Sequence, residues 1–225
     1  MMPQQENTSI DNNNPLPVIL LNMITSRRVS QIIYVAAKLG ITNVEFQLLD
    51  ICEHQPASIY AYGFDVVYAR FLLTHLPDPA SAVNSFYAAL KPGGVVIIED
   101  IDNSGSFVFP ESKAFQRYYE LYSAAVRRRR GDPDIGPRLP LLLKDRGFAD
   151  IGLNVVQPMG LEGEVKFINP ITMENITDAV VQMGLASREE IDDLIEEMYD
   201  FVASPWTIAG TPRIIQAWGW RPTAL

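Results

Sequence analysis

The chain has 225 residues, 48% of them hydrophobic, which is enough apolar material for one substantial core. Its net charge of −9 disfavours a nucleic-acid partner, because binding phosphate backbones needs a concentrated positive field. One cysteine and two histidines offer neither an internal disulfide nor a zinc-type ligand set, and no apolar run reaches the roughly 20 residues that span a bilayer. We therefore expect a cytoplasmic protein without metal or membrane that acts on a small molecule or another protein.

The predicted domain organisation is a tail followed by a single domain. Residues 1–14 are polar with almost nothing to bury, so they predict a disordered or loosely tethered tail. We expect one α/β domain over residues 15–225, interrupted by a helical insertion at about 170–203.

The first predicted unit of the domain is a βαβ unit. Residues 16–21 are apolar and predict a strand, and residues 26–40 carry an apolar helical stripe that ends at Gly40. Residues 43–49 predict a second strand, with Asp50 at its carboxyl end. Ligands of open α/β sheets bind at this end of the strands.

The central segment alternates strand and helix signals. Residues 64–68 predict a buried strand, and the apolar period of residues 82–90 predicts a helix. Lys91-Pro92-Gly93-Gly94 is expected to end that helix with a left-handed glycine cap. Residues 95–98 then predict a buried parallel strand.

The carboxy-terminal half is predicted to be mostly helical, with two strands near its ends. A tyrosine-rich helix ends in four arginines at 127–130, and residues 139–146 predict a helix stopped by Gly147. The remaining predicted elements are a strand at 148–156, helices at 172–183 and 187–202, the second opened by a capping box at Ser187, and a closing strand at 214–220.

Several segments together resemble class I S-adenosylmethionine-dependent methyltransferases. The resemblance rests on FDVVYARFLLTHLPDP and LKPGGVVIIED, and on VILLNM, AAKLGITNVEFQLLDI and LLLKDRGFADIGLNVVQP, which occur in the family's order over roughly residues 16–222. It implies a Rossmann-like fold with a mostly parallel sheet, whose last strand runs antiparallel between strands 5 and 6. It also implies S-adenosylmethionine as the cofactor.

The family's glycine-rich turn and first strand are apparently missing. Only Gly40 and Gly63 precede Phe64, whereas such turns use several glycines to bring the backbone close to the cofactor. The sheet could close directly, or a partner chain could fill the gap in a homodimer or a complex with a complete homologue. Alternatively, residues 15–22 serve as the first strand.

The resemblance assigns cofactor-binding residues. Asn22, with its neighbour Met23, would lie at the ribose, Asp50 and Ile51 at the adenine, and Arg70 at the methionine end. An amide at position 22 gives a weaker ribose anchor than the family's carboxylate, because charge-assisted hydrogen bonds are about twice as strong as neutral ones. If residues 15–22 form the first strand, Asn22 loses this assignment.

Three further residues are assigned to catalysis and substrate binding. His75 is the candidate general base, and Tyr118 and Tyr122 are candidate substrate contacts on a lid helix. Simpler alternatives remain for each: a packing role for His75 and a core position for the tyrosines. Likewise, Asp50 could be a cap and Arg70 part of a surface salt bridge, while Asp100 and Asp102 share one strand face and could cooperate.

Two functions follow from these observations. The first is transfer of a methyl group from S-adenosylmethionine to a small-molecule acceptor. The second, motivated by the missing glycine-rich turn, is a methyltransferase-like scaffold that has lost the cofactor and acts as a binding or regulatory partner.

Overall fold

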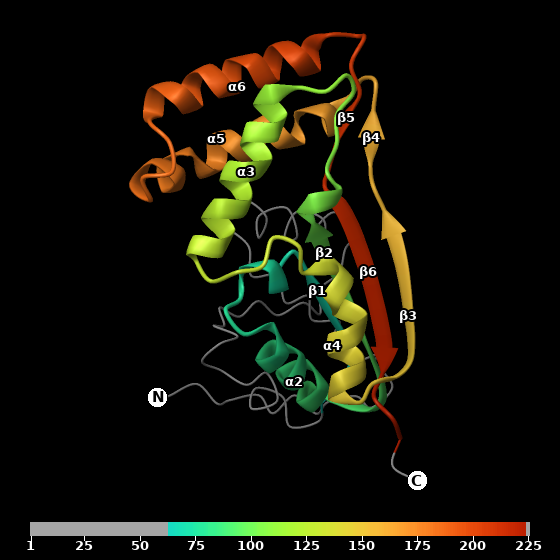
Figure 1. Cartoon of the computed structure of the whole chain (residues 1–225). Coiled ribbons are helices and arrows are strands. Elements are labelled where there is room, and N and C mark those ends of the chain that lie inside the picture. Colours follow the sequence, from blue (N-terminus) through green and yellow to red (C-terminus); the bar gives the residue numbers. More distant parts are fainter. Residues whose placement is uncertain (1–62, 224–225) are drawn as a thin grey trace, which may run out of the picture.

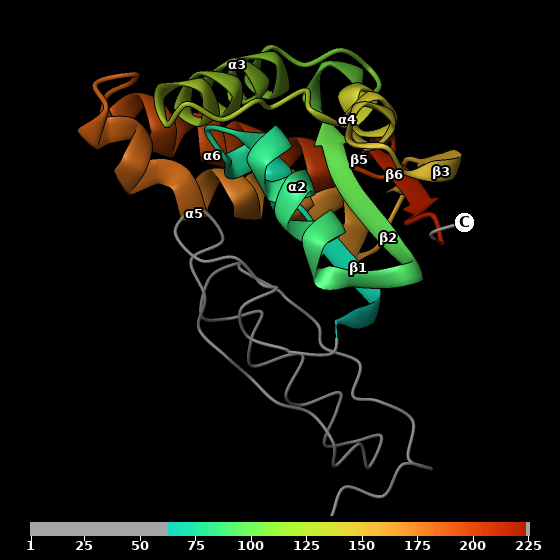
Figure 2. The same ribbon diagram turned by 90° about the horizontal axis from the view of Figure 1, so that it is seen from below.

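The computed structural model describes residues 63–223 of the chain. Within them, one half of the molecule is a four-stranded sheet covered by α2 (Pro79–Ala89) and α4 (Leu139–Arg146). The other half is a cluster of α3 (Lys113–Arg128), α5 (Ile168–Gln182) and α6 (Arg188–Ala203). Figure 1 shows these three helices beyond one end of the sheet, and Figure 2 shows them grouped together in a second view.

The sheet has the strand order β1-β2-β6-β3. Its strands are β1 (Phe64–Arg70), β2 (Leu90–Asp102), β3 (Ala149–Val156) and β6 (Arg213–Trp220). β1 and β2 are parallel, and β6 runs antiparallel to both β2 and β3. The prediction that the last strand inserts antiparallel between its two neighbours is therefore confirmed.

The sheet packs against α2 and α4 through one continuous apolar core. Alternate residues of β2 point into it, and Val96 and Ile98 are fully buried. Phe86 of α2 and Leu143 of α4 pack on the same face of the sheet. This layer fixes β1 and β2 side by side and so places their carboxyl ends together.

Two predicted helix ends had different outcomes. α4 ends as predicted, because Gly147 takes the left-handed conformation with a φ of 95°. The predicted glycine cap of α2 is wrong, since Leu90 is already extended and ends the helix. The residue before a proline avoids the helical region, so Lys91 cannot continue the helix. Gly93 uses its φ of 82° within the first residues of β2 instead.

The helical cluster has its own buried core of Phe115, Tyr118, Met173, Ile191 and Met198 among others. α6 begins as predicted, with the Ser187 hydroxyl accepting a hydrogen bond from the Glu190 amide at 3.1 Å. The Glu190 carboxylate does not complete a capping box. It binds Arg117 of α3 instead and so joins two helices.

Short elements lie between the main helices and strands. They are η2 (Leu73–His75), η3 (Asn103–Gly105), η4 (Gly136–Arg138), β4 (Met159–Gly160), η5 (Glu164–Phe167) and β5 (Ala209–Gly210). No helix within residues 63–223 is long and apolar enough to cross a membrane. The division of the chain into a tail and a single domain with an insertion stays a prediction.

Candidate functional site

The carboxyl ends of β1 and β2 form the described part of the candidate site. The two strands are in register up to the pair Arg70 and Glu99. Directly after β1, Phe71 takes a left-handed conformation with a φ of 51°, and its amide donates to the Glu99 carbonyl at 2.9 Å. A bulky residue with positive φ is uncommon and is often found where the backbone turns sharply at a functional site.

Arg70 is fixed at this edge by an ion pair. Its Nε lies 3.2 Å from Glu99 Oε2, and the other Glu99 oxygen accepts from Gln216 at 2.9 Å. The Arg70 side chain is 49% exposed, and its terminal nitrogens form no hydrogen bond with another residue of the 63–223 region. A guanidinium held in this way has the donor geometry to bind a carboxylate.

Asp100 is fully buried at the end of β2 and anchors the loop that follows β1. Its oxygens accept hydrogen bonds from the amides of Thr74 at 3.1 Å and Ile101 at 2.9 Å. Burial raises the pKa of the Asp100 carboxyl to about 6, although bonds from the backbone amides at Ile101, Thr74, Leu73 and Leu72 act in the opposite direction. Asp100 therefore positions η2 and, with it, His75.

His75 lies at the end of η2 with an exposed side chain. Partial desolvation of the ring and, second, the nearby charge of Arg129 lower the pKa of His75 below its ordinary value. The imidazole is therefore neutral at pH 7 and able to accept a proton.

Asp102 has partners different from those of Asp100. It forms an ion pair with Arg213 at 2.8 Å and accepts from the Ser104 hydroxyl. The two aspartates are both buried on β2, as expected for residues on one strand face, but they have separate partners, and cooperation between them stays a prediction. No group of three or more His, Cys, Asp or Glu side chains in the described region could hold a metal ion.

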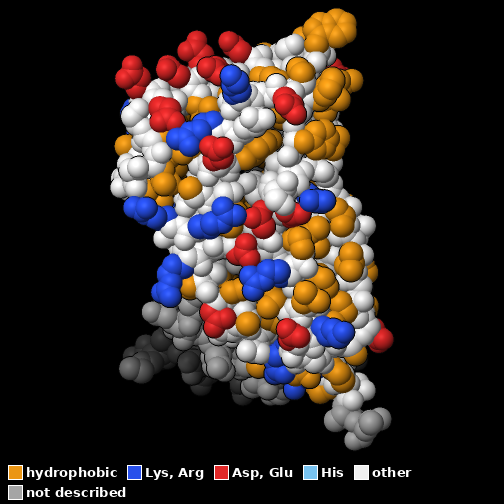
Figure 3. Space-filling view, in the orientation of Figure 1, with side chains coloured by type: hydrophobic (Ala, Val, Ile, Leu, Met, Phe, Trp, Pro, Cys, Tyr) orange, Lys and Arg blue, Asp and Glu red, His pale blue; other side chains and the backbone are white. Residues whose placement is uncertain are grey.

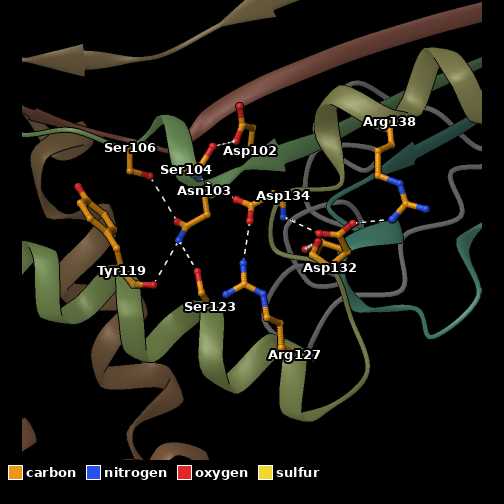
Figure 4. A network of polar contacts seen from close by, with 11 residues as sticks. Asp102, Asn103, Ser104, Ser106, Tyr119, Ser123, Arg127, Asp132, Asp134 and Arg138 are labelled. Carbon is orange, nitrogen blue, oxygen red and sulfur yellow. Dashed lines mark hydrogen bonds and ion pairs between the residues drawn. The ribbon is translucent and has the colours of Figure 1, made fainter.

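A polar network joins the end of β2 to α3 (Figure 4). The Asn103 amide donates to Ser123 Oγ at 2.9 Å and to the Tyr119 carbonyl at 3.3 Å. The Ser104 amide donates to Asp134 at 2.8 Å, and Asp134 in turn accepts from Arg127 at 2.9 Å. This network sets the position of α3 relative to the sheet edge.

The two candidate substrate residues lie on α3 in different surroundings. Tyr118 is only 2% exposed and belongs to the core of the helical cluster. Tyr122 is half-buried and close enough to Asp100 for the aspartate charge to add to burial in raising the pKa of its hydroxyl. Of the two, Tyr122 is the one near the sheet edge, and contact with substrate stays a prediction for both.

The other predicted cofactor residues, Asn22, Met23, Asp50 and Ile51, lie outside the described residues, as does the place of the first strand and glycine-rich turn. The half-exposed guanidinium of Arg70 is compatible with the predicted contact to the carboxylate of S-adenosylmethionine, and this contact stays a prediction. The adenosine assignments remain predictions.

Comparison with known proteins decides the family. A family model described as a methyltransferase domain matches residues 17–137, which is more than half of the chain. The chain belongs to this family. The predicted class of S-adenosylmethionine-dependent methyltransferases is thereby confirmed, and with it the predicted cofactor as the one that this class uses.

A solved structure supports the fold of this methyltransferase domain. A putative methyltransferase from Bacillus halodurans superposes with a TM-score of 0.52 at 20% identity and covers 89% of this chain and 81% of its own. The predicted Rossmann-like fold is thus confirmed.

Two curated relatives match over shorter regions. Methyltransferase str2 of Strobilurus tenacellus is 28% identical over 117 residues, covering 51% of this chain and 42% of that protein. Phosphoethanolamine N-methyltransferase 1 of Arabidopsis thaliana is 30% identical over 112 residues, covering 48% of this chain and 20% of that protein. The chain therefore matches less than half the length of each of these relatives.

Proposed function

We propose that the chain catalyses transfer of a methyl group from S-adenosylmethionine to a small-molecule acceptor. The observation that carries this proposal is the match of residues 17–137 to the methyltransferase domain family. The sheet supports it, because β6 lies antiparallel between β2 and β3 and leaves the carboxyl ends of β1 and β2 for a ligand.

Each residue has a stated part in this proposal. Asn22, Met23, Asp50 and Ile51 would hold the adenosine, and Arg70 would bind the carboxylate. When bound, S-adenosylmethionine supplies an electrophilic methyl group on its sulfonium. The protein's main contribution is to align the acceptor with that methyl group, because positioning alone can contribute a large part of such a barrier reduction.

His75 would act as the general base. Its neutral imidazole can take the proton that the acceptor nitrogen or oxygen gives up when it gains the methyl group, and can then release the proton to solvent. Asp100 would keep His75 in place through the amide of Thr74.

The test is formation of S-adenosylhomocysteine with a panel of acceptors. The panel includes phosphoethanolamine, which gives its name to one group of relatives, and simple phenols. We expect turnover with at least one acceptor and, for His75→Ala, a fall in kcat of about 100-fold with unchanged cofactor affinity. Equal turnover in the variant and the wild type would remove His75 from the reaction.

The alternative proposal is a scaffold that no longer binds the cofactor. It is favoured by one sequence observation, since only Gly40 and Gly63 precede Phe64 where the family has a glycine-rich turn. It predicts no saturable binding of S-adenosylhomocysteine and a stable complex with a partner protein.

A further inference from the structure

The turn that follows α3 concentrates positive charge in an acidic protein. Residues 127–138 contain five arginines and two aspartates, whereas the whole chain has a net charge of −9. The four arginines at 127–130 are all exposed. The helix dipole accounts for cations in the last turn of α3, but Arg129 and Arg130 lie beyond its last residue.

The aspartates nearby do not neutralise three of these arginines. Asp134 accepts from Arg127 at 2.9 Å, and Asp132 accepts from Arg138 at 2.7 Å (Figure 4). Within residues 63–223, the side chains of Arg128, Arg129 and Arg130 form no ion pair with a carboxylate. Figure 3 shows basic side chains gathered in the region where α3 ends.

The turn is held rigidly against the loop after β1. The Asp132 amide donates to the Thr74 carbonyl at 3.0 Å, and the Thr74 hydroxyl donates to the Asp132 carbonyl at 2.9 Å. Between them, a Cβ on Gly131 would lie 2.3 Å from the Thr74 carbonyl oxygen, so only glycine allows this close approach. The backbone that follows the arginines is therefore held beside η2.

His75 lies beside this cationic surface. It directly follows Thr74, and the positive charge of Arg129 is near enough to lower the pKa of its imidazole. The carboxylates around this loop are already engaged. Asp100 accepts from the Thr74 amide, and Asp78 accepts from the Ser81 amide at 3.0 Å.

We propose that Arg128, Arg129 and Arg130, beside the neutral imidazole of His75, form a binding surface for a phosphate monoester carried by the methyl acceptor. Crowded cations with no paired carboxylate are stabilised by an anion, and guanidinium groups match phosphate oxygens in pairs. Because the rest of the protein is acidic, this surface would also attract an anionic acceptor to the sheet edge. The acceptor role rests on the proposed function, whereas binding of the anion does not.

The direct test is an NMR titration of His75 with sodium sulfate, which keeps its charge between pH 5 and 8. The His75 resonance is assigned by its loss in His75→Asn. Sulfate bound between His75 and Arg129 should raise the pKa of His75 by about half a unit or more, beyond the effect of sodium chloride at equal ionic strength. A shift no larger than that of sodium chloride would overturn the proposal.

Two variants locate the effect. In the double variant Arg129→Gln, Arg130→Gln the pKa of His75 should start higher, because a like charge is gone, and should respond to sulfate no more than to chloride. Arg188→Gln is the matched control, since Arg188 is an exposed arginine at the start of α6 that pairs with Asp178. A full sulfate response in the double variant would contradict the assignment.

Two organic probes, glycerol 2-phosphate and glycerol, test whether the surface binds a phosphate group that is part of a larger molecule as well as a free anion. Glycerol 2-phosphate should perturb the His75 resonance and glycerol should not, whereas a response to sulfate without a response to glycerol 2-phosphate would refute the acceptor role. Calorimetric titration with S-adenosylhomocysteine is run on the same samples. Its failure in the wild type would count against the proposed function, while the sulfate shift still decides the anion site.

Discussion

The burial of Asp100 gives a prediction about pH and stability. Its pKa is raised from 3.8 to about 6 in the folded protein, so the folded state holds this proton more tightly than the unfolded state. Between these two pH values the folded state carries more protons, and stability must fall as pH rises. The Asp100 contribution is most favourable below pH 3.8 and is lost as pH rises through about 6.

The magnitude follows from the size of the shift. A change of about two pKa units corresponds to about 3 kcal/mol between the limits of low and high pH. At pH 5 the Asp100 contribution is about 1 kcal/mol more favourable than at pH 7.5. Asp100→Asn removes this dependence and also removes one acceptor for the backbone amides of η2.

The measurement is equilibrium unfolding in guanidinium chloride at pH 5, 6, 7 and 7.5 for the wild type and Asp100→Asn. The difference in unfolding free energy should shift in favour of the wild type by about 1 kcal/mol from pH 7.5 to pH 5. Asp145→Asn, at an exposed position of α4, controls for the chemical change. A difference between wild type and Asp100→Asn that is the same at every pH would show that this carboxyl group is solvated, and the account of η2 would be wrong.

Three other substitutions test separate parts of the structure. Lys166 is 1% exposed and donates to the carbonyls of Leu161 and Ser204 and to the Thr207 hydroxyl. Lys166→Met should therefore lower the unfolding free energy by about 2 kcal/mol in a denaturation assay. Lys144→Met, on the exposed side of α4, is the control and should change it little. Gly131→Ala should loosen the contact with Thr74 and return the pKa of His75 toward its ordinary value, and an unchanged NMR titration would show that the turn does not position His75. Arg213→Gln should destabilise the protein by about 1.5 kcal/mol, because Asp102 is 4% exposed and would lose its ion partner while Arg213 itself is 43% exposed. Thermal unfolding with no loss of stability would contradict this.

The sequence predicts the sheet well because its strands are marked by local patterns. The apolar runs at 64–68 and 95–98 and the alternation near 214–220 each correspond to a strand, and Gly147 marks a helix end that needs no distant contact. The prediction for the end of α2 is wrong because the effect of Pro92 on the preceding residue ends the helix before the two glycines are reached.

The arrangement of the site depends on contacts that local patterns do not contain. Asp100 and Thr74 are 26 residues apart, and only the packing of β1 on β2 makes the carboxylate a partner of the η2 amides. Thr74 and Asp132 are 58 residues apart, so local sequence patterns do not predict that the arginine run lies near His75 either. In the sequence Lys166 resembles any surface lysine. It can be buried because its ammonium group donates hydrogen bonds to three oxygens that come from different segments of the chain.

Calorimetric titration with S-adenosylhomocysteine tests whether the carboxyl edge of the sheet binds the adenosyl cofactor. We expect saturable binding at one site per chain, weakened about 10-fold or more by Asp50→Ala and also weakened by Arg70→Gln, because each would remove a charged contact to the ligand. The absence of saturable heat at millimolar ligand with folded protein would contradict the claim and leave the scaffold proposal in its place.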